Sequence, residues 1–388
     1  MKVIDLFSGV GGFSSGFMKA GFDVLMANEI DPMIAESYRH NHRNTLMINK
    51  DIKEFVTNID EILKEELELF ENKERATQIR EGLTNVDVII GGPPCQGFSM
   101  AGARIRKNKD EEFINDPRNF LFKYYFKMIQ KFEPKYFIME NVQGLESMNG
   151  GAILNEIISL FTNEKNFKYG KYYISRMVVS ANELGVPQAR KRLIIMGSKY
   201  ESIEIASELN RVKQKLNIPK SVTIEEAIGD LMYLQSGEGK FESEYLNKPY
   251  TEYQRNRRKD MNILYNHVAP KHNKVALERI AMVEMGGKLN DSSIKSVHSG
   301  AYGRLHLDEV ACTITTRFDT PSAGRVIHPS LNRALTPREA ARIQSFDDDF
   351  IFYGNKTSIG KQIGNAVPPL VAEALANIIL DDFKKRKL

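Results

Sequence analysis

The chain has 388 residues, of which 42% are hydrophobic and 27% charged, a composition that is typical of folded globular proteins and excludes disordered and fibrous classes. Its net charge of +4 is too small to identify a partner, and its two cysteines, Cys95 and Cys312, cannot build a disulfide framework. Because the start shows no signal-peptide pattern and no run approaches the ~18 apolar residues of a membrane span, we expect a cytoplasmic protein outside the membrane.

Short apolar runs alternate with helix-period segments through the first half of the sequence. This βαβ alternation predicts an α/β fold, with a largely parallel sheet of about six strands of the Rossmann type and helices on both faces. One predicted helix covers residues 120–129, and a further strand is expected just before Asp51. The other strands are predicted over residues 3–7, 24–28, 86–90, 136–139, 173–179 and 192–196.

The alternation stops after Gly197. Residues 198–330 are polar and aperiodic, which predicts a second, smaller and irregular domain. We therefore divide the chain into a first domain over 1–197, the second domain over 198–330, and a return to the first domain over 331–388. A weak alternation over 310–316 is a candidate strand of either domain, and Cys312 within it is expected to be a packing residue.

The last part of the chain carries clear helix signals. Thr336, Pro337 and Glu339 have the spacing of a helix start with a capping box. A final apolar helix is predicted from Pro369 to about residue 383.

Charge is unevenly distributed along the chain. Residues 60–81 contain 8 acids and 4 bases, and we interpret them as a solvated helical excursion or a partner surface. Residues 251–279 contain 7 bases and 3 acids and are a candidate contact for phosphates, although a solvated face explains them equally well. The histidines and cysteines show no metal-ligand spacing, so no metal is predicted.

A glycine-rich loop follows the first predicted strand. Gly9, Gly11 and Gly12 would let the backbone approach a ligand where a helix opens, although a tight structural turn is the alternative. Glu29 ends the second strand, where an acid can accept hydrogen bonds from ribose hydroxyls, and Asp51 ends the third, where it could hold an adenine amine. Because the glycines do not fit the pyrophosphate fingerprint, we favour an adenosyl ligand without a pyrophosphate.

Cys95 lies in Gly-Pro-Pro-Cys-Gln after another predicted strand, at the usual active-site edge of such a sheet. A lone cysteine is more often a small buried residue, but here Glu140 ends the next strand at the same edge. A thiolate needs nearby positive charge, which Arg190 or Arg192 could supply. These features make Cys95 a candidate nucleophile.

Taken together, these motifs resemble the DNA (cytosine-5)-methyltransferases of bacterial restriction-modification systems, which use S-adenosyl-L-methionine. The resemblance covers about residues 1–198 and 333–370 in the order of the family. The motifs that carry it are the loop over 5–12, Glu29, Asp51, Pro-Pro-Cys-Gln, Glu-Asn-Val, Gln-x-Arg-x-Arg, Arg-x-Leu-Thr-x-Arg-Glu and Gly-Asn-Ala-Val.

The resemblance implies a role for each matching residue. Cys95 would add to carbon 6 of cytosine, Glu140 would stabilise ring nitrogen 3 and the exocyclic amine, and Arg190 would hold the carbonyl oxygen at position 2. Gln188 and Arg192 complete that motif. The cofactor, released as S-adenosyl-L-homocysteine, would contact Phe7, Ser8, Gly9, Gly11, Gly12, Glu29, Ile30, Asp51, Ile52, Pro94, Leu121, Asn365 and Ala366. Many members have Ser where Ala366 stands, so only a backbone contact carries over there.

The family acts on double-stranded DNA, from which the target cytosine must be flipped. Arg104, Arg106 and Lys107 lie in a segment, 99–118, that resembles the family's mobile loop. Residues 198–330 would be the target-recognition domain, and within it phosphates would be met by Arg255, Arg257, Arg258 and Lys259. We expect a monomer, with a cognate restriction endonuclease or other defence proteins as candidate partners.

Two other functions remain open at this point. One branch of the family methylates cytosine in transfer RNA, and the catalytic motifs do not distinguish it, although the long basic region favours duplex DNA. The other alternative is a non-catalytic DNA-binding relative, against which the intact Cys95, Glu140 and Arg190 argue.

Overall fold

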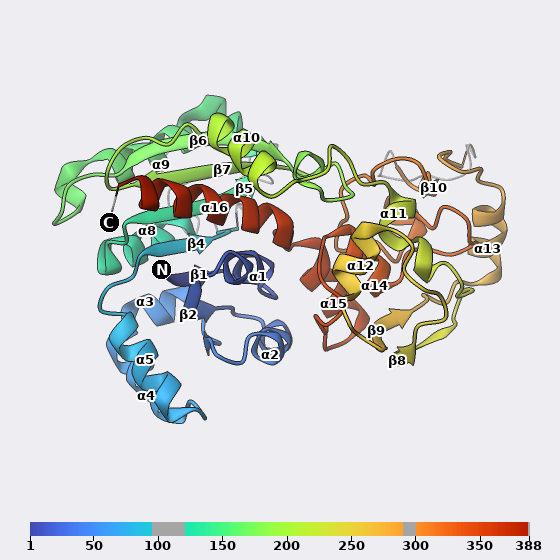
Figure 1. Cartoon of the computed structure of the whole chain (residues 1–388), viewed down its shortest axis with the longest axis horizontal. Coiled ribbons are helices and arrows are strands. Elements are labelled where there is room, and N and C mark those ends of the chain that lie inside the picture. The colour runs from blue at the N-terminus through green and yellow to red at the C-terminus, as the bar shows by residue number, and fades with distance from the viewer. Residues whose placement is uncertain (95–120, 290–299, 387–388) are drawn as a thin grey trace, which may run out of the picture. The chain divides into compact units, whose positions relative to one another are not determined.

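The computed structural model describes residues 1–94, 121–289 and 300–386 (Figure 1). The chain forms two compact units. The first unit contains residues 1–179, 191–217 and 372–388, and the second unit contains 180–190 and 218–371. These limits differ from the expected divisions at 197 and 330. The second unit also contains residues 180–190, which include Gln188, and it extends to residue 371, just after the start of the last helix.

The first unit is built on one seven-stranded sheet with the order β3-β2-β1-β4-β5-β7-β6. Strands β1 to β5 run parallel, whereas β7 pairs antiparallel with β5. The α/β prediction is confirmed, and all seven predicted strands are present. Their bounds are β1 (Lys2–Leu6), β2 (Asp23–Asn28), β3 (Leu46–Ile48), β4 (Val88–Gly91), β5 (Tyr136–Val142), β6 (Tyr173–Ser180) and β7 (Lys191–Ser198).

Helices cover both faces of this sheet. On one face, α8 and α9 share the main core with strand residues such as Ile4 and Phe137. On the other, Tyr136 donates a hydrogen bond to Asp382 of α16, and α2 packs Tyr38 on β2 and β3. The helices are α1 (Gly12–Lys19), α2 (Pro32–Asn41), α3 (Ile52–Thr57), α4 (Ile59–Leu69), α5 (Lys73–Gly82), α8 (Leu121–Phe132), α9 (Ala152–Thr162), α10 (Ile205–Lys215) and α16 (Pro369–Lys385).

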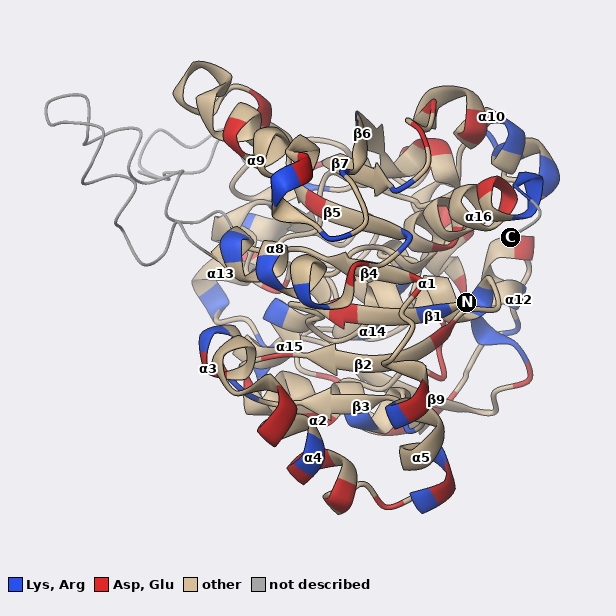
Figure 2. Cartoon of the chain, turned by 90° about the vertical axis from the view of Figure 1, so that its left-hand side faces the viewer, with Lys and Arg blue, Asp and Glu red and all other residues tan. Residues whose placement is uncertain are grey.

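The acid-rich stretch 60–81 forms helices α4 and α5, as the helical interpretation predicts. Figure 2 shows these charged helices at the β3 end of the sheet. They bury Ile59, Ile62 and Ile79 in the main core, so they are packed elements with a charged outer face.

The second unit contains short elements joined by long loops. Its elements are α11 (Ile224–Ile228), β8 (Gly239–Glu244), α12 (Glu252–Arg258), β9 (Ile263–Val268), α13 (Lys274–Ala281), β10 (Gly303–Arg304), β11 (Arg325–Ile327), α14 (Pro337–Ile343) and α15 (Lys356–Gly364). Thr336 and Glu339 form the predicted capping box of α14. The expected strand over 310–316 is absent from the described residues, where one isolated bridge joins Ala311 to Gln188.

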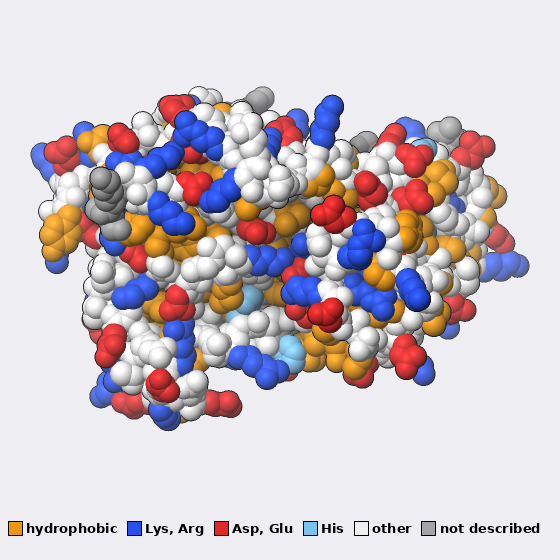
Figure 3. All heavy atoms as spheres, in the orientation of Figure 1, with side chains coloured by type: hydrophobic (Ala, Val, Ile, Leu, Met, Phe, Trp, Pro, Cys, Tyr) orange, Lys and Arg blue, Asp and Glu red, His pale blue; other side chains and the backbone are white. Residues whose placement is uncertain are grey.

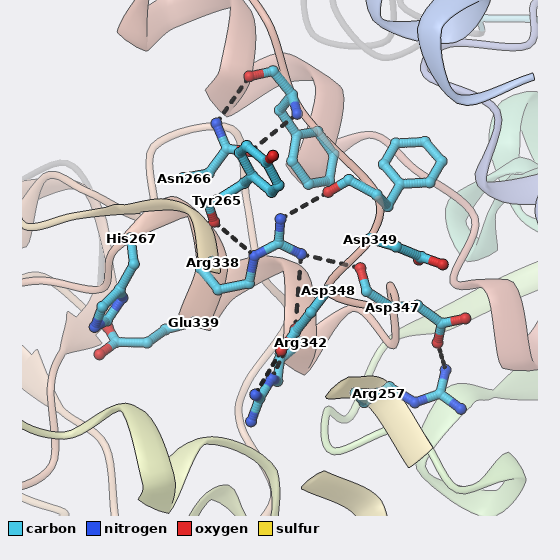
Figure 4. A network of polar contacts seen from close by, with 12 residues as sticks. Arg257, Tyr265, Asn266, His267, Arg338, Glu339, Arg342, Asp347, Asp348 and Asp349 are labelled. Carbon is cyan, nitrogen blue, oxygen red and sulfur yellow. Dashed lines mark hydrogen bonds and ion pairs between the residues drawn. The ribbon is translucent and has the colours of Figure 1, made fainter. Parts of the chain in front are cut away.

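Buried arginines hold the second unit together, and Figure 4 shows this network. Arg342 pairs with both Asp230 and Asp348, while Arg338 donates to the backbone carbonyls of Tyr265, Asp347 and Phe350. These charge-assisted guanidinium bonds join segments of the second unit that are far apart in the sequence.

One helical stretch, Lys356–Lys385, is long and apolar enough by length and composition to cross a membrane, which the sequence analysis did not expect. Of its most apolar window, 72% is buried inside the protein. This is the pattern of a core helix.

Candidate active site and cofactor cradle

The loop between β1 and α1 has a backbone shape that few residues adopt. Phe7, Gly9 and Gly11 have φ angles of 55°, 54° and 94°, in the left-handed region that favours glycine. The N–H of Ser8 donates to Asn28 O at 3.0 Å, which fixes the loop to the end of β2. Helix α1 then begins at Gly12 without a side-chain cap. The loop therefore presents backbone groups at the carboxyl edge of the sheet.

Glu29 orders this loop. Its carboxylate accepts the N–H of Gly9 at 3.1 Å and the N–H of Asp31 at 2.8 Å. Burial raises the pKa of Glu29, although these two hydrogen bonds offset part of the effect. A carboxylate has about four acceptor sites, so acceptor capacity for ribose hydroxyls remains.

The other predicted cofactor residues of the first unit differ in exposure. Asp51 is exposed and caps α3, and Ile30 is 61% exposed, an apolar surface of the kind that suits an aromatic base. Pro94 is also exposed. Ile52 is 4% exposed and belongs to the main core, so the expectation that its side chain lines the cofactor is wrong. Leu121 is partly buried and packs against the same core.

A buried acid lies beneath the loop. Asp5 accepts a hydrogen bond from Ser14 at 2.6 Å, and the Ser14 and Tyr38 hydroxyls are 2.7 Å apart. Burial raises the pKa of Asp5 to about 7, although the Ser14 hydrogen bond lowers it. Its Oδ1 atom has no hydrogen-bond partner within the described residues. The sequence analysis did not single out this group, although an acid within an apolar strand was a signal for it.

These features fit S-adenosyl-L-methionine. An unpartnered buried carboxyl oxygen suits the neighbourhood of a positively charged ligand. A Cβ atom at Gly9 would meet nothing within 4 Å, so there is open space at the loop. Phe7, Ser8, Gly9, Gly11 and Gly12 would provide the cradle.

Glu140 and Arg192 form an ion pair at the edge of the sheet where the catalytic residues are predicted. Arg192 Nε lies 2.9 Å from Glu140 Oε1, and the side chains are 23% and 12% exposed. The other carboxylate oxygen would lie 3.2 Å from a Cβ atom at Gly92, which places it beside the Gly-Pro-Pro turn. Asn141 ties that turn to β5 by donating to Pro93 O at 3.0 Å. A polar, partly shielded carboxyl group thus adjoins the segment that leads to residue 95.

Several predicted residues lie outside the described part of the chain. These are Cys95 and the loop residues Arg104, Arg106 and Lys107.

Gln188 and Arg190 are buried within the second unit, at 0% and 3% exposure. Arg190 Nη1 donates to the carbonyls of Ile314 and Gly364. The Arg190 guanidinium is thus bound to backbone, whereas Arg192 pairs with Glu140, and the role expected for Arg190 at the base stays a prediction.

Asn365 and Ala366 follow α15 in the second unit. Asn365 is the exposed C-cap of that helix, and Ala366 is 9% exposed.

The basic cluster of α12 is divided by the structure. Arg257 is 8% exposed, donates to Ser345 O and forms an ion pair with Asp347, so the structure disfavours the expected phosphate contact. Lys259 is paired with Asp347 and Asp349, and the Arg258 guanidinium lies 3.6 Å from the ring centre of Tyr245. Arg255 is exposed. Figure 3 shows acidic side chains among the basic ones on the drawn face over α12.

Cys312 is exposed, so the expectation that it is a packing residue is also wrong. Within the described ranges, His, Cys, Asp and Glu side chains form no group that could hold a metal ion.

Comparison with known proteins identifies the family. The model of the C-5 cytosine-specific DNA methylase family matches residues 1–381. The chain belongs to this family. It is 34% identical to the type II methyltransferase M.DdeI of Desulfomicrobium norvegicum over 98% of this chain and 88% of that protein. It is 35% identical to the type II methyltransferase M1.HphI of Haemophilus parahaemolyticus over 98% and 87%.

Solved structures agree. An E. coli prophage-encoded protein, described as a DNA modification methyltransferase, is 26% identical and superimposes with a TM-score of 0.69 over 98% of this chain and 99% of that one. Schizosaccharomyces pombe Dnmt2, at 15% identity and a TM-score of 0.60 over 99% of both chains, shares the fold. The family member described here is thus a DNA cytosine-5 methyltransferase that uses S-adenosyl-L-methionine, as the sequence predicted.

Proposed function

We propose that the protein methylates one cytosine, flipped out of a specific double-stranded DNA sequence, with Cys95 as the nucleophile and the Glu140–Arg192 pair as the group that activates the base. The observation that carries this proposal is the 2.9 Å ion pair beside the Gly-Pro-Pro turn. Carbon 5 of cytosine is a poor nucleophile, so the ring must first be activated by addition at carbon 6.

The residues would act in order. The Cys95 thiolate forms a bond to carbon 6, and the electron pair of the 5,6 double bond moves into the ring. The Glu140 carboxyl group would hold a proton at ring nitrogen 3, and Arg192 would fix the orientation of Glu140 and bind the oxygen at position 2. S-Adenosyl-L-methionine, when bound, would supply an electrophilic methyl group to carbon 5, with S-adenosyl-L-homocysteine as the leaving group. Water accepts the proton from carbon 5, and the returning electron pair expels the Cys95 thiolate.

The cofactor would lie on the loop over 7–12. Glu29 would bind the ribose through its remaining acceptor sites, Asp51 the adenine amine, and Ile30 one face of the adenine ring. From the family resemblance, the Asn365 side chain and the backbone of Ala366 remain proposed cofactor contacts.

The relatives support a restriction-modification role, since M.DdeI and M1.HphI are both named type II methyltransferases. We therefore propose a monomer that acts on DNA in the bacterial cytoplasm, with a cognate endonuclease of the same recognition sequence. The second unit would contain the target-recognition part.

Methyl transfer from labelled cofactor to duplex DNA and to transfer RNA, measured side by side, tests this proposal. We expect label in duplex DNA, and base-resolution mapping should place it on one cytosine of one sequence. Glu140→Gln should lower kcat by about 10²- to 10⁴-fold, the range for a lost proton-transfer group. Label in transfer RNA alone would contradict the proposed substrate.

A further inference from the structure

Gln188 and Arg190 bind the backbone of one residue of the second unit, Ile314, at both its N–H and its carbonyl. The side-chain oxygen of Gln188 accepts the N–H of Ile314 at 3.0 Å, and Arg190 Nη1 donates to its carbonyl at 3.4 Å. Ala189 N–H also donates to Ala311 O at 2.8 Å. Because Ile314 is fully buried, residues 311–316 are fixed against residues 187–190.

The same two side chains reach the ends of two helices. Gln188 Nε2 donates to the side-chain oxygen of Gln344 at the end of α14, and Arg190 Nη1 donates to Gly364 O at 3.0 Å at the end of α15. A Cβ atom at Gly364 would overlap the backbone of Thr316. Close packing and hydrogen bonds therefore make this segment rigid.

The rigid segment carries exposed polar side chains. Thr315 and Arg317 are exposed on either side of Thr316, between the buried Ile314 and Phe318. The Thr315 hydroxyl oxygen accepts the N–H of Arg317 at 3.3 Å. The described residues include no carboxylate paired with Arg317.

A second cation lies on α15, the helix whose Gly360 and Gly364 closely approach the backbone of Thr316, the residue before Arg317. Lys356, in the first turn of α15, is 64% exposed and pairs with Asp319 at 3.0 Å. Burial and the charge of Arg317 lower the pKa of Lys356, so the two cations repel each other. Asp319 pairs with Lys356 and with no other cation among the described residues, so a bound anion would relieve the repulsion between Lys356 and Arg317.

We propose that Arg317, Lys356 and the Thr315 hydroxyl form a clamp for a DNA backbone phosphate, and that Gln188 and Arg190 are its positioning residues. This proposal rests on the proposed function, because the clamp would bind the DNA that the enzyme methylates. A rigid support lowers the entropy cost of binding, and phosphate contacts set register without reading sequence.

Binding of the full-length protein to duplex DNA over a series of salt concentrations tests the clamp. For Arg317→Ala we expect a Kd about 10- to 150-fold higher, the range for a lost hydrogen bond to a charged group, on the methylated sequence and on an unrelated duplex alike. The slope of log K against log salt should fall by roughly 0.9 for each phosphate that the variant no longer neutralises. Thr315→Val should weaken binding less, and cofactor affinity by calorimetry should not change. Arg211→Ala on α10, whose side chain is 63% exposed, is the matched control and should bind as wild type.

A double-variant cycle tests the positioning role. Gln188→Glu keeps the size of the side chain but removes the hydrogen bonds that its amide group donates, so it should raise Kd and lower the salt slope as Arg317→Ala does. Together the two changes should cost little more than either alone, within about twofold. Additive losses would overturn the positioning role. Wild-type Kd and slope for Arg317→Ala would overturn the clamp, and this exposed variant gives the answer even if Gln188→Glu fails to fold. A wild-type protein that methylates no DNA would instead contradict the proposed function itself.

Discussion

Removing one guanidinium should destabilise the second unit strongly. Arg342 donates to Asp230 at 2.6 and 3.1 Å and to Asp348 at 2.7 and 2.9 Å, and none of the three side chains is exposed. Burial would raise the pKa of Asp348, but Arg342 outweighs it and holds that pKa well below its usual range. In Arg342→Met, two buried carboxylates therefore lose their counter-charge.

Breaking a buried ion pair by removing one partner costs about 3–5 kcal/mol. Because Arg338 and the Tyr245 hydroxyl still contact Asp348, we expect a loss of about 3–5 kcal/mol in the free energy of unfolding rather than the sum for two pairs. A loss of that size is a large fraction of the stability of a typical domain. Arg342→Lys keeps the charge without the planar fork and should fall between wild type and Arg342→Met.

Urea unfolding followed by circular dichroism, with hydrogen exchange of peptides from residues 218–371, measures the loss where it should occur. Adding Asp230→Asn and Asp348→Asn to Arg342→Met removes the unpaired charges and should restore part of the stability. Arg211→Met on the surface should change it by no more than about 0.5 kcal/mol. A loss below about 1 kcal/mol for Arg342→Met would refute the reasoning that this network is a major source of stability.

Three further changes test the site. Cys95→Ala should abolish methylation and the covalent trapping of the enzyme on 5-fluorocytosine DNA while leaving cofactor binding intact; an adduct formed by the variant would exclude Cys95 as the nucleophile. Glu29→Ala should weaken S-adenosyl-L-methionine binding by ~1–3 kcal/mol, because Gly9 loses the partner of its N–H, and unchanged calorimetry would contradict the cradle. The pKa of Asp5, raised from 3.8 to about 7, implies that its contribution to stability is present below pH 3.8 and is lost as the pH rises through 7. Asp5→Asn should therefore gain stability relative to wild type between pH 4 and 7, by at most ~4 kcal/mol, and parallel pH profiles would contradict a buried, titrating Asp5.

The sheet and the cofactor loop were predictable because their signals are local. A strand that is buried on both faces requires a continuous apolar run, so β4 and β5 can be located from composition alone. A backbone turn with positive φ at Gly9 and Gly11 requires glycine, and the Thr336 and Glu339 capping box needs residues only three positions apart.

Which arginine pairs with Glu140 was decided by tertiary structure. Arg190 and Arg192 are the same residue type two positions apart, and what separates them is their partners. Those of Arg190 lie 124 and 174 residues away in the sequence, at Ile314 and Gly364, whereas Arg192 meets Glu140 across two paired strands.

The tertiary structure also decided which charged side chains are exposed. The sequence determines that Arg257 is positive, but an arginine that is exposed and one that is bound to a buried carboxylate look the same in the sequence. Only the fold brings Asp347 to Arg257 and leaves Arg317 exposed near Lys356. Local periodicity therefore determined the elements of this protein, while long-range pairing of polar groups decided which of its charges remain available for DNA.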